Sequence, residues 1–410
     1  MMAAKSIQSR PKSHNAVVLS LVVVLLLASD CVTKFGAGVS ALKIPALLIF
    51  AGYGVFLAFV ERVDKWKILL CLVATVALYL EMPFQDALES YTSQLLFFAL
   101  LAVTVVCAPL VLDSKATLRR AFVMAFVFVI LMMIWSIPDI ISQLHFYSST
   151  SRLRIKGCFS NPNSLGHISA FLVIMFVASA PARIAADKKK NAAKGFLVIA
   201  VLFLFIVASG SNTALIETIA FLALVFIGSR FDRFTPRART LCVLLLVVSL
   251  AVVLISLFNW AVSQETFRMR LESLTSVSSK KASLLVGLGY VSSSGISSVT
   301  QAAGGVVDML WVSLLYRVGI VGYIAYALYF FAAYKGALKS KNKWLIIAFL
   351  AAVLLQSMAE SYLSSVMSFV SWFIWAFGSA LPTFDSIEDQ TQEDAGKPPF
   401  KRIVQKRIVQ

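Results

Sequence analysis

The sequence has little of the charge with which a soluble protein covers its surface. Only 14% of the 410 residues are charged, whereas 59% are hydrophobic, and the mean hydropathy is +0.85. This composition excludes an ordinary soluble domain and is typical of a protein with several membrane spans. The net charge of +17 does not by itself indicate a nucleic-acid partner, because the cations follow a membrane topology, as described below.

Cysteine and histidine are scarce as well. The five Cys residues show no CxxC spacing, and the three His residues form no HExxH motif. We therefore expect neither a disulfide framework nor a zinc site nor a catalytic metal. The Cys side chains are expected to act as small apolar residues inside helices, and no cofactor is expected.

Long apolar runs between charged clusters predict an all-α, polytopic membrane protein with about 12 transmembrane helices. Two runs, 68–80 and 344–358, are shorter than the roughly 20 residues of a span and are expected to extend into neighbouring sequence. The first run has the length of a signal peptide, but further spans follow at once, so we interpret it as an uncleaved helix. The predicted spans lie near 15–31, 42–60, 68–80, 95–112, 121–141, 165–180, 196–209, 213–228, 240–258, 309–333, 344–358 and 366–382.

The positions of Lys and Arg predict the orientation of these spans. If the N-terminus is cytoplasmic and the spans alternate, 27 of the 37 Lys and Arg residues lie on the cytoplasmic side, in agreement with the positive-inside rule. Both termini are then cytoplasmic: residues 1–14 precede the transmembrane domain 15–382, and residues 383–410 form a disordered tail. Of the outer loops, 142–164 is rich in cations, and 259–308, between helices nine and ten, is the largest.

Eight of the ten remaining cations gather on the predicted outer face of the second half, against the general trend. An anionic ligand at the outer leaflet is the simplest reason for such a concentration. An ordinary basic loop that touches lipid phosphates is the alternative. The eight cations are Arg152, Arg154, Lys156, Arg268, Arg270, Lys280, Lys281 and Arg317.

The densest group lies in RLRIKGCFSNPNSLG, residues 152–166. Its three cations alternate, so in an extended segment their side chains point the same way. An Asn-Pro-Asn turn follows, and Asn163 or Ser164 is expected to cap a helix that begins at Leu165. Cations next to a helix N-terminus predict a site for a phosphate or pyrophosphate group.

The same stretch resembles the R-x-x-G-x-F-x-N-P-N-x-L-[AG] signature of the O-antigen ligase and O-antigen polymerase superfamily. SGSNTAL at 209–215 is similar to the S-x-S-R-T-A-L turn of that family. RLE at 270–272, followed by GLG at 287–289, is similar to a segment of its large outer loop. VDMLWVSLLYRVG at 307–319 resembles its H-N-x-Y-L-x-L-L-x-x-x-G helix start.

The resemblance implies a metal-independent glycosyltransferase at the outer face of a bacterial inner membrane. Its donor would be an oligosaccharide on undecaprenyl pyrophosphate, held by Arg154 and Arg270, with Asp308 as the base for the acceptor hydroxyl. Membrane lipid and a chain-length regulator are expected partners, and nucleic acid is not. The other expected substrate-binding residues are Arg152, Lys156, Asn161, Asn163, Ser211, Asn212, Glu217, Arg268, Lys280, Lys281 and Arg317.

The chain departs from the family pattern at two positions. Asp308 stands where the ligases have His, which favours a polymerase that joins lipid-linked repeat units over a ligase that transfers the glycan to the lipid A core. A helix N-cap without a catalytic role is an equally favoured interpretation of Asp308. Asn212 replaces an Arg of the family, which removes one expected phosphate contact. Either Lys156, Lys280 or Lys281 supplies that contact, or the head group of the substrate is held differently.

Three further polar residues have open interpretations. Glu217 lies in a predicted span and is either a functional carboxylate or the partner of a loop cation. His167 is expected to be structural, with support of the neighbouring motif as the alternative. Arg317 lies nine residues after Asp308, on the opposite face of a helix, and is expected to bind a carboxylate of another helix. A transporter or a flippase for lipid-linked sugars is the rival class, but the internal repeats typical of transporters are not evident.

Overall fold

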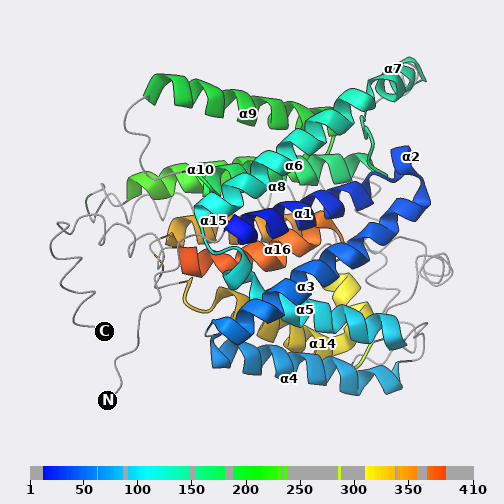
Figure 1. The fold of residues 1–410 in the computed structure, drawn as a ribbon, viewed down its shortest axis with the longest axis vertical. Helices are drawn as coiled ribbons and strands as arrows, with labels where there is room; N and C mark the ends of the chain where they lie inside the picture. Colours follow the sequence, from blue (N-terminus) through cyan, green and yellow to red (C-terminus); the bar gives the residue numbers. More distant parts are fainter. Residues whose placement is uncertain are drawn as a thin grey trace.

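The computed structural model of the chain is a bundle of α-helices that run side by side (Figure 1). It describes residues 13–61, 63–85, 91–146, 154–180, 188–231, 235, 237, 285–287, 310–337, 340, 342–357 and 367–384. Within these ranges there is no β-strand, so the predicted all-α fold holds for the described part of the chain.

The helices follow the apolar runs of the sequence, as expected where lipid cannot satisfy an open backbone. Their bounds are α1 (Ser13–Asp30), α2 (Val32–Phe35), α3 (Lys43–Val60), α4 (Lys65–Glu81), α5 (Tyr91–Val111), α6 (Lys115–Trp135), α7 (Ile137–Phe146), α8 (Pro162–Ala178), α9 (Lys188–Ser209), α10 (Asn212–Phe231), α14 (Leu310–Tyr334), α15 (Lys343–Ser357) and α16 (Phe369–Ala380), with short 3₁₀ turns η1 (Ala37–Leu42), η2 (Met82–Phe84) and η6 (Leu381–Thr383).

Eleven of the twelve predicted spans coincide with a described helix, and the twelfth, 240–258, lies outside the described residues. Six helical segments are long and apolar enough to cross a membrane, which makes the chain compatible with a multi-pass membrane protein. The total of twelve spans and their orientation stay predictions. The six segments are Ala37–Val60, Lys65–Phe84, Gln94–Val111, Lys115–Trp135, Asn212–Phe231 and Arg317–Tyr334.

Two boundaries differ from the prediction. The span expected at 121–141 ends early, because α6 stops at Trp135 and the chain turns at Ser136 into the separate helix α7. The range 142–164, expected as a loop, therefore begins with the last residues of α7. Apolar content alone does not mark such a turn, since the residues on both sides of it are hydrophobic.

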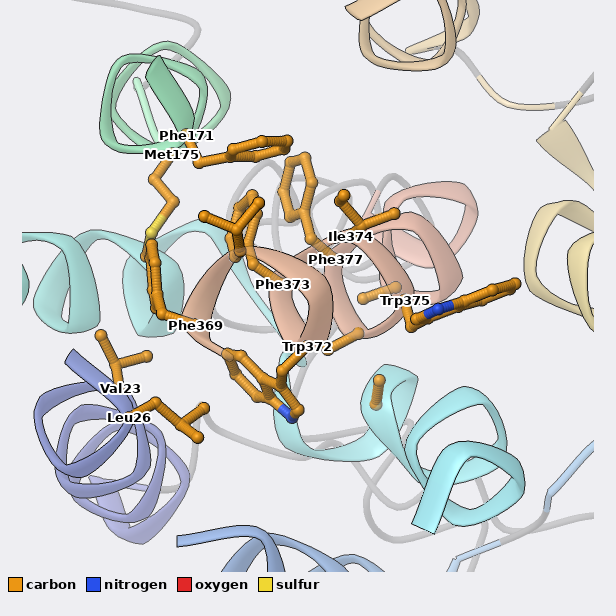
Figure 2. Close-up of a cluster of buried hydrophobic side chains, with 14 of the residues drawn as sticks. Val23, Leu26, Phe171, Met175, Phe369, Trp372, Phe373, Ile374, Trp375 and Phe377 are labelled. Carbon is orange, nitrogen blue, oxygen red and sulfur yellow. The ribbon is translucent and has the colours of Figure 1, made fainter. Parts of the chain in front are cut away.

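Helix α16 forms the centre of the bundle, and all its side chains from Phe369 to Ala380 are buried. Figure 2 shows its aromatic rings packed against side chains of α1 and α8. The Phe373 ring stacks on Phe377 at a centroid distance of 4.7 Å and meets Phe171 of α8 edge-on at 5.7 Å. A helix that is apolar on every side is expected to lie in such a surrounded position.

Helix α8 is also surrounded, because every residue from Leu165 to Met175 is buried. The peripheral helices differ, since they turn large apolar side chains outward, as Phe59 of α3 (88% exposed) and Phe196 of α9 (75% exposed) show. Such an apolar exterior is costly in water and is expected where a helix faces lipid. The enclosed α8 thus gives a rigid base to the candidate site at its first turn.

Polar contacts join the helices at one end of the bundle, which we call the terminal end because α1 begins and α16 ends there. Lys67 at the start of α4 donates a hydrogen bond to the Ser379 hydroxyl of α16 (2.8 Å). Lys335 after α14 binds Asp64 before α4 (2.7 Å), and this bond lowers the pKa of the Asp64 carboxyl. The opposite end carries α2 and the segment 154–161, and we call it the loop end (Figure 1).

Helix α14 is broken at Gly319, whose backbone angles (φ 56°, ψ −161°) are not helical. Residues 285–287 lie in the break, and the amide of Val321 donates a hydrogen bond to the Leu285 carbonyl (3.1 Å). From the residue after η2, the side-chain amide of Gln85 donates to the Val286 carbonyl (3.0 Å). The inserted segment thus supplies a partner that the broken helix lacks, as a buried backbone amide requires.

We expect Gly319→Ala to lower the free energy of unfolding by about 1–3 kcal/mol, because only glycine adopts this backbone region without strain. A Cβ there would also lie 2.4 Å from the Leu285 carbonyl oxygen. Unfolding in mixed detergent micelles measures the effect. Gly52→Ala is the matched control, since a Cβ at that exposed position of α3 meets no atom within 4 Å. Equal stability of both variants would contradict the need for glycine at the break.

Candidate functional site

The first turn of α8 lies at the loop end and is built by the Asn-Pro-Asn turn. The helix begins at Pro162, and the Asn161 side chain accepts a hydrogen bond from the Asn163 amide (2.8 Å). The prediction of a helix from Leu165 capped by Asn163 or Ser164 was therefore wrong by three residues. The reason is local, because proline is favoured in the first helical position, where its missing N–H costs nothing.

Arg154 connects this turn to the end of α9. Its guanidinium donates a hydrogen bond to the Asn163 side-chain oxygen and a longer one to the Ser209 carbonyl (3.4 Å). The Arg154 side chain lies over Gly210 (φ +64°), where a Cβ would come within 3.1 Å of it. These contacts fix the guanidinium between two helix ends. They use two of its five N–H donors.

The backbone next to Arg154 is also held. The Ile155 amide donates to the Ala208 carbonyl (2.9 Å), and the Ile155 side chain packs against the hydrophobic core. Lys156 follows it and is partly exposed. The common direction expected for the cation side chains stays a prediction, and Arg152 lies outside the described residues.

The turn between α9 and α10 packs tightly on α8. A Cβ at Gly166 would lie 2.6 Å from the Ser209 hydroxyl and 2.7 Å from the Ser211 Cβ, so only glycine fits there. Ser211 is buried and its hydroxyl lies 3.4 Å from the Ala214 amide, in a capping position for α10. Asn212, the first residue of α10, is exposed. The N-termini of α8 and α10 therefore meet beside Arg154.

A buried pair lies below this surface. The Nδ1 atom of His167 in α8 is 2.9 Å from Oε1 of Glu217 in α10, and both side chains are fully buried. Each residue is five positions after the start of its helix, roughly 7–8 Å along the helix axis. Glu217 therefore pairs with His167, whereas the sequence alone allows either a functional carboxylate or the partner of a loop cation. Its second carboxylate oxygen has no hydrogen-bond partner among the described residues.

Together these residues form a site suited to an anion. The N-termini of α8 and α10 contribute the positive ends of their helix dipoles, and Arg154 adds a fixed charge in a fork that fits phosphate oxygens. In the first turn of α8 the amides of Asn163 and Ser164 already donate to Asn161, so the charge and the dipoles carry the site. Asn163 lies in the first turn of α8, and Lys156 lies in the segment that leads to it. We call this set, with Ser211 and Asn212, the loop-end site.

Other predicted site residues lie elsewhere. Arg317 is on α14 directly before the break, and its backbone carbonyl lies 3.4 Å from the Gln85 side-chain amide. Helix α14 packs on α4, α5 and α16, whereas α8 packs on α6, α9, α10 and α16. The predicted residues outside the described ranges are Arg152, Arg268, Arg270, Lys280, Lys281 and Asp308.

Glu81 was not predicted as a site residue. It is buried at the end of α4 (3% exposed), and neither carboxylate oxygen has a hydrogen-bond partner in the described part of the chain. The signal in the sequence is its position at the start of 81–94, an acidic outer segment without Lys or Arg. Gln85, one turn further on, binds the backbone at the α14 break.

Comparison with known proteins adds no relative: no protein-family model matches the chain, and a search of the curated proteins finds no similar sequence. Among the described residues, no group of three or more His, Cys, Asp and Glu side chains is placed to hold a metal ion.

Proposed function

We propose that this chain is an integral membrane glycosyltransferase that polymerises oligosaccharide repeat units carried on undecaprenyl pyrophosphate. The single observation that supports this most is the convergence of Arg154, Asn163 and the 209–212 turn at two helix N-termini. The two segments that carry the sequence resemblance are 55 residues apart at their contact, yet they form one anion-accepting surface.

In the proposed reaction, an acceptor hydroxyl attacks the sugar carbon that is bonded to the donor pyrophosphate. The bond from that carbon to the pyrophosphate oxygen breaks, and negative charge develops on the leaving group. Arg154 and the helix N-termini stabilise this charge without reorganisation, which is where fixed cations contribute most. Arg270 as a second phosphate contact and Asp308 as the base remain proposals, because both lie outside the described residues.

This mechanism uses side-chain cations where other glycosyltransferases use a metal, and it takes place at the outer face of a bacterial inner membrane. Membrane lipid around the bundle and a chain-length regulator are the proposed partners. The His167–Glu217 pair lies behind the site and is proposed to hold α8 and α10 in register.

Ligation of the glycan to the lipid A core is the second candidate. The same donor site would serve both reactions, and Asp308 in place of His is the feature that favours polymerisation. A flippase for the same lipid is less favoured, because its anion site must be reachable from both membrane faces, whereas the loop-end site lies at one end of the bundle.

Reconstitution tests the proposal. Purified protein in liposomes is supplied with an undecaprenyl-pyrophosphate oligosaccharide, with and without lipid A core, and the products are separated on a gel. A ladder from the donor alone is the expected result. A product that requires the core would show a ligase, and a donor that crosses the bilayer unreacted would favour the flippase.

A further inference from the structure

Two cysteines from distant parts of the sequence meet at the loop end. Cys31 follows the last residue of α1, and Cys158 lies in the segment that carries Arg154. Their Sγ atoms are 3.1 Å apart although 127 positions separate them, and both side chains are completely buried.

Backbone contacts on both sides fix the two cysteines next to each other. The Thr33 amide donates a hydrogen bond to the Cys158 carbonyl (3.3 Å). The Thr33 hydroxyl also donates to the Gly157 and Cys158 carbonyls. Gly157 has a φ of +60°, and a Cβ there would lie 2.5 Å from the sulfur of Met133 in α6. The turn before Cys158 therefore has little freedom to move its sulfur away from Cys31.

The other described cysteines are in a different situation. All four described cysteines are free thiols, but Cys71 and Cys107 are buried inside the helices α4 and α5. The pair at the loop end instead joins two connecting segments at the end of the bundle opposite the chain termini. Under the predicted orientation this end faces the oxidising side of a bacterial inner membrane, where disulfides form and persist.

We propose that Cys31 and Cys158 form an intramolecular disulfide that fixes the segment 154–161 to the outer end of α1. The sulfurs must approach by about 1 Å to reach the bonding distance of a disulfide, a movement that side-chain rotation provides. The bond anchors the chain between Arg154 and Asn161, four residues after the first and three before the second. It therefore stabilises the position of the cation relative to the α8 N-terminus.

The bond forms by thiol–disulfide exchange while both thiols are still accessible during folding. One Cys thiolate attacks a disulfide of a thiol oxidase and forms a mixed disulfide, and the second Cys thiolate then displaces the oxidase sulfur. The two cysteines lose two protons and two electrons, and the oxidase leaves as a dithiol.

The state of the cysteines in the membrane tests this inference. Membranes from cells collected in acid are denatured, free thiols are blocked with N-ethylmaleimide, disulfides are reduced, and the released thiols are labelled with a polyethylene-glycol maleimide. We expect two labels on most of the wild-type chains and none on Cys31→Ser or Cys158→Ser. Cys71→Ser is the matched control and is expected to keep both labels.

A peptide map of the unreduced wild-type protein provides the second measurement and does not depend on the folding of any variant. It should contain one cross-linked peptide that joins the sequences around Cys31 and Cys158. Wild-type protein without labels, or labels that persist in Cys31→Ser, would overturn the proposal. Both measurements detect a covalent bond between two cysteines and do not measure enzyme activity. A negative result would therefore overturn the disulfide and leave the proposed enzyme activity untouched.

Discussion

Replacing Arg154 by alanine is expected to reduce polymer formation by about 10²–10³-fold, the loss measured when one preorganised charge-stabilising group is removed. The guanidinium is held by Asn163 and Ser209 beside two helix N-termini, so it needs no reorganisation when charge develops on the leaving pyrophosphate. The rate of ladder formation in liposomes measures the effect, normalised to the amount of folded protein.

Two further variants separate charge from geometry. Arg154→Lys keeps the positive charge but not the planar fork, so we expect an intermediate loss. Lys194→Ala removes an exposed cation of α9 and should leave the rate unchanged. Full activity of Arg154→Ala would show that the residue only holds the turn together. A loss of folded protein that matches the loss of activity would lead to the same conclusion.

Removal of one partner of the His167–Glu217 pair is expected to lower the free energy of unfolding by about 3–5 kcal/mol, because the remaining polar group stays buried without its partner. We expect this for Glu217→Leu and for His167→Leu. In the double variant both polar groups are gone, so most of the cost should be recovered. Unfolding in mixed detergent micelles gives all three values and the coupling between the residues.

An exposed ion pair of the same chain provides the control. Asp64 and Lys335 are 2.7 Å apart at the terminal end, with 45% and 34% of their side chains exposed. Asp64→Asn should cost at most about 1 kcal/mol, since water screens such pairs. If the variants of the buried pair cost no more than Asp64→Asn, then α8 and α10 do not depend on this contact.

The positions of the helices were largely predictable from the sequence. Lipid requires long apolar segments, and cations cluster between them, so eleven predicted spans coincide with described helices. Which helices face lipid was not predictable, because core and lipid are both apolar. The buried α16 and the outward-facing α3 are both rich in Phe and Ala. Hydrophobic periodicity therefore hardly distinguishes a helix that is buried in a membrane bundle from a helix that faces lipid.

Only part of the candidate site could be predicted. The motif indicated Arg154 and Asn163, but their mutual hydrogen bond and the contact with Ser209 depend on how α9 returns to α8. The His167–Glu217 pair spans 50 positions, and the two residues received separate interpretations. The break at Gly319 was also missed, because a glycine inside an apolar run often stays helical in a membrane and the inserted segment 285–287 comes from a distant loop.

The Gln85 side chain has a consequence for the order in which this protein folds. It joins the segment after α4 to Val286 and Arg317, residues 201 and 232 positions later in the chain. Contacts of such high sequence separation form slowly, because a long loop must close before any interaction compensates for the lost entropy. Helix α4 is synthesised long before α14, so Gln85 gains these partners only after most of the chain has been made. The newly inserted protein thus passes through a period in which this corner is open to proteases and chaperones.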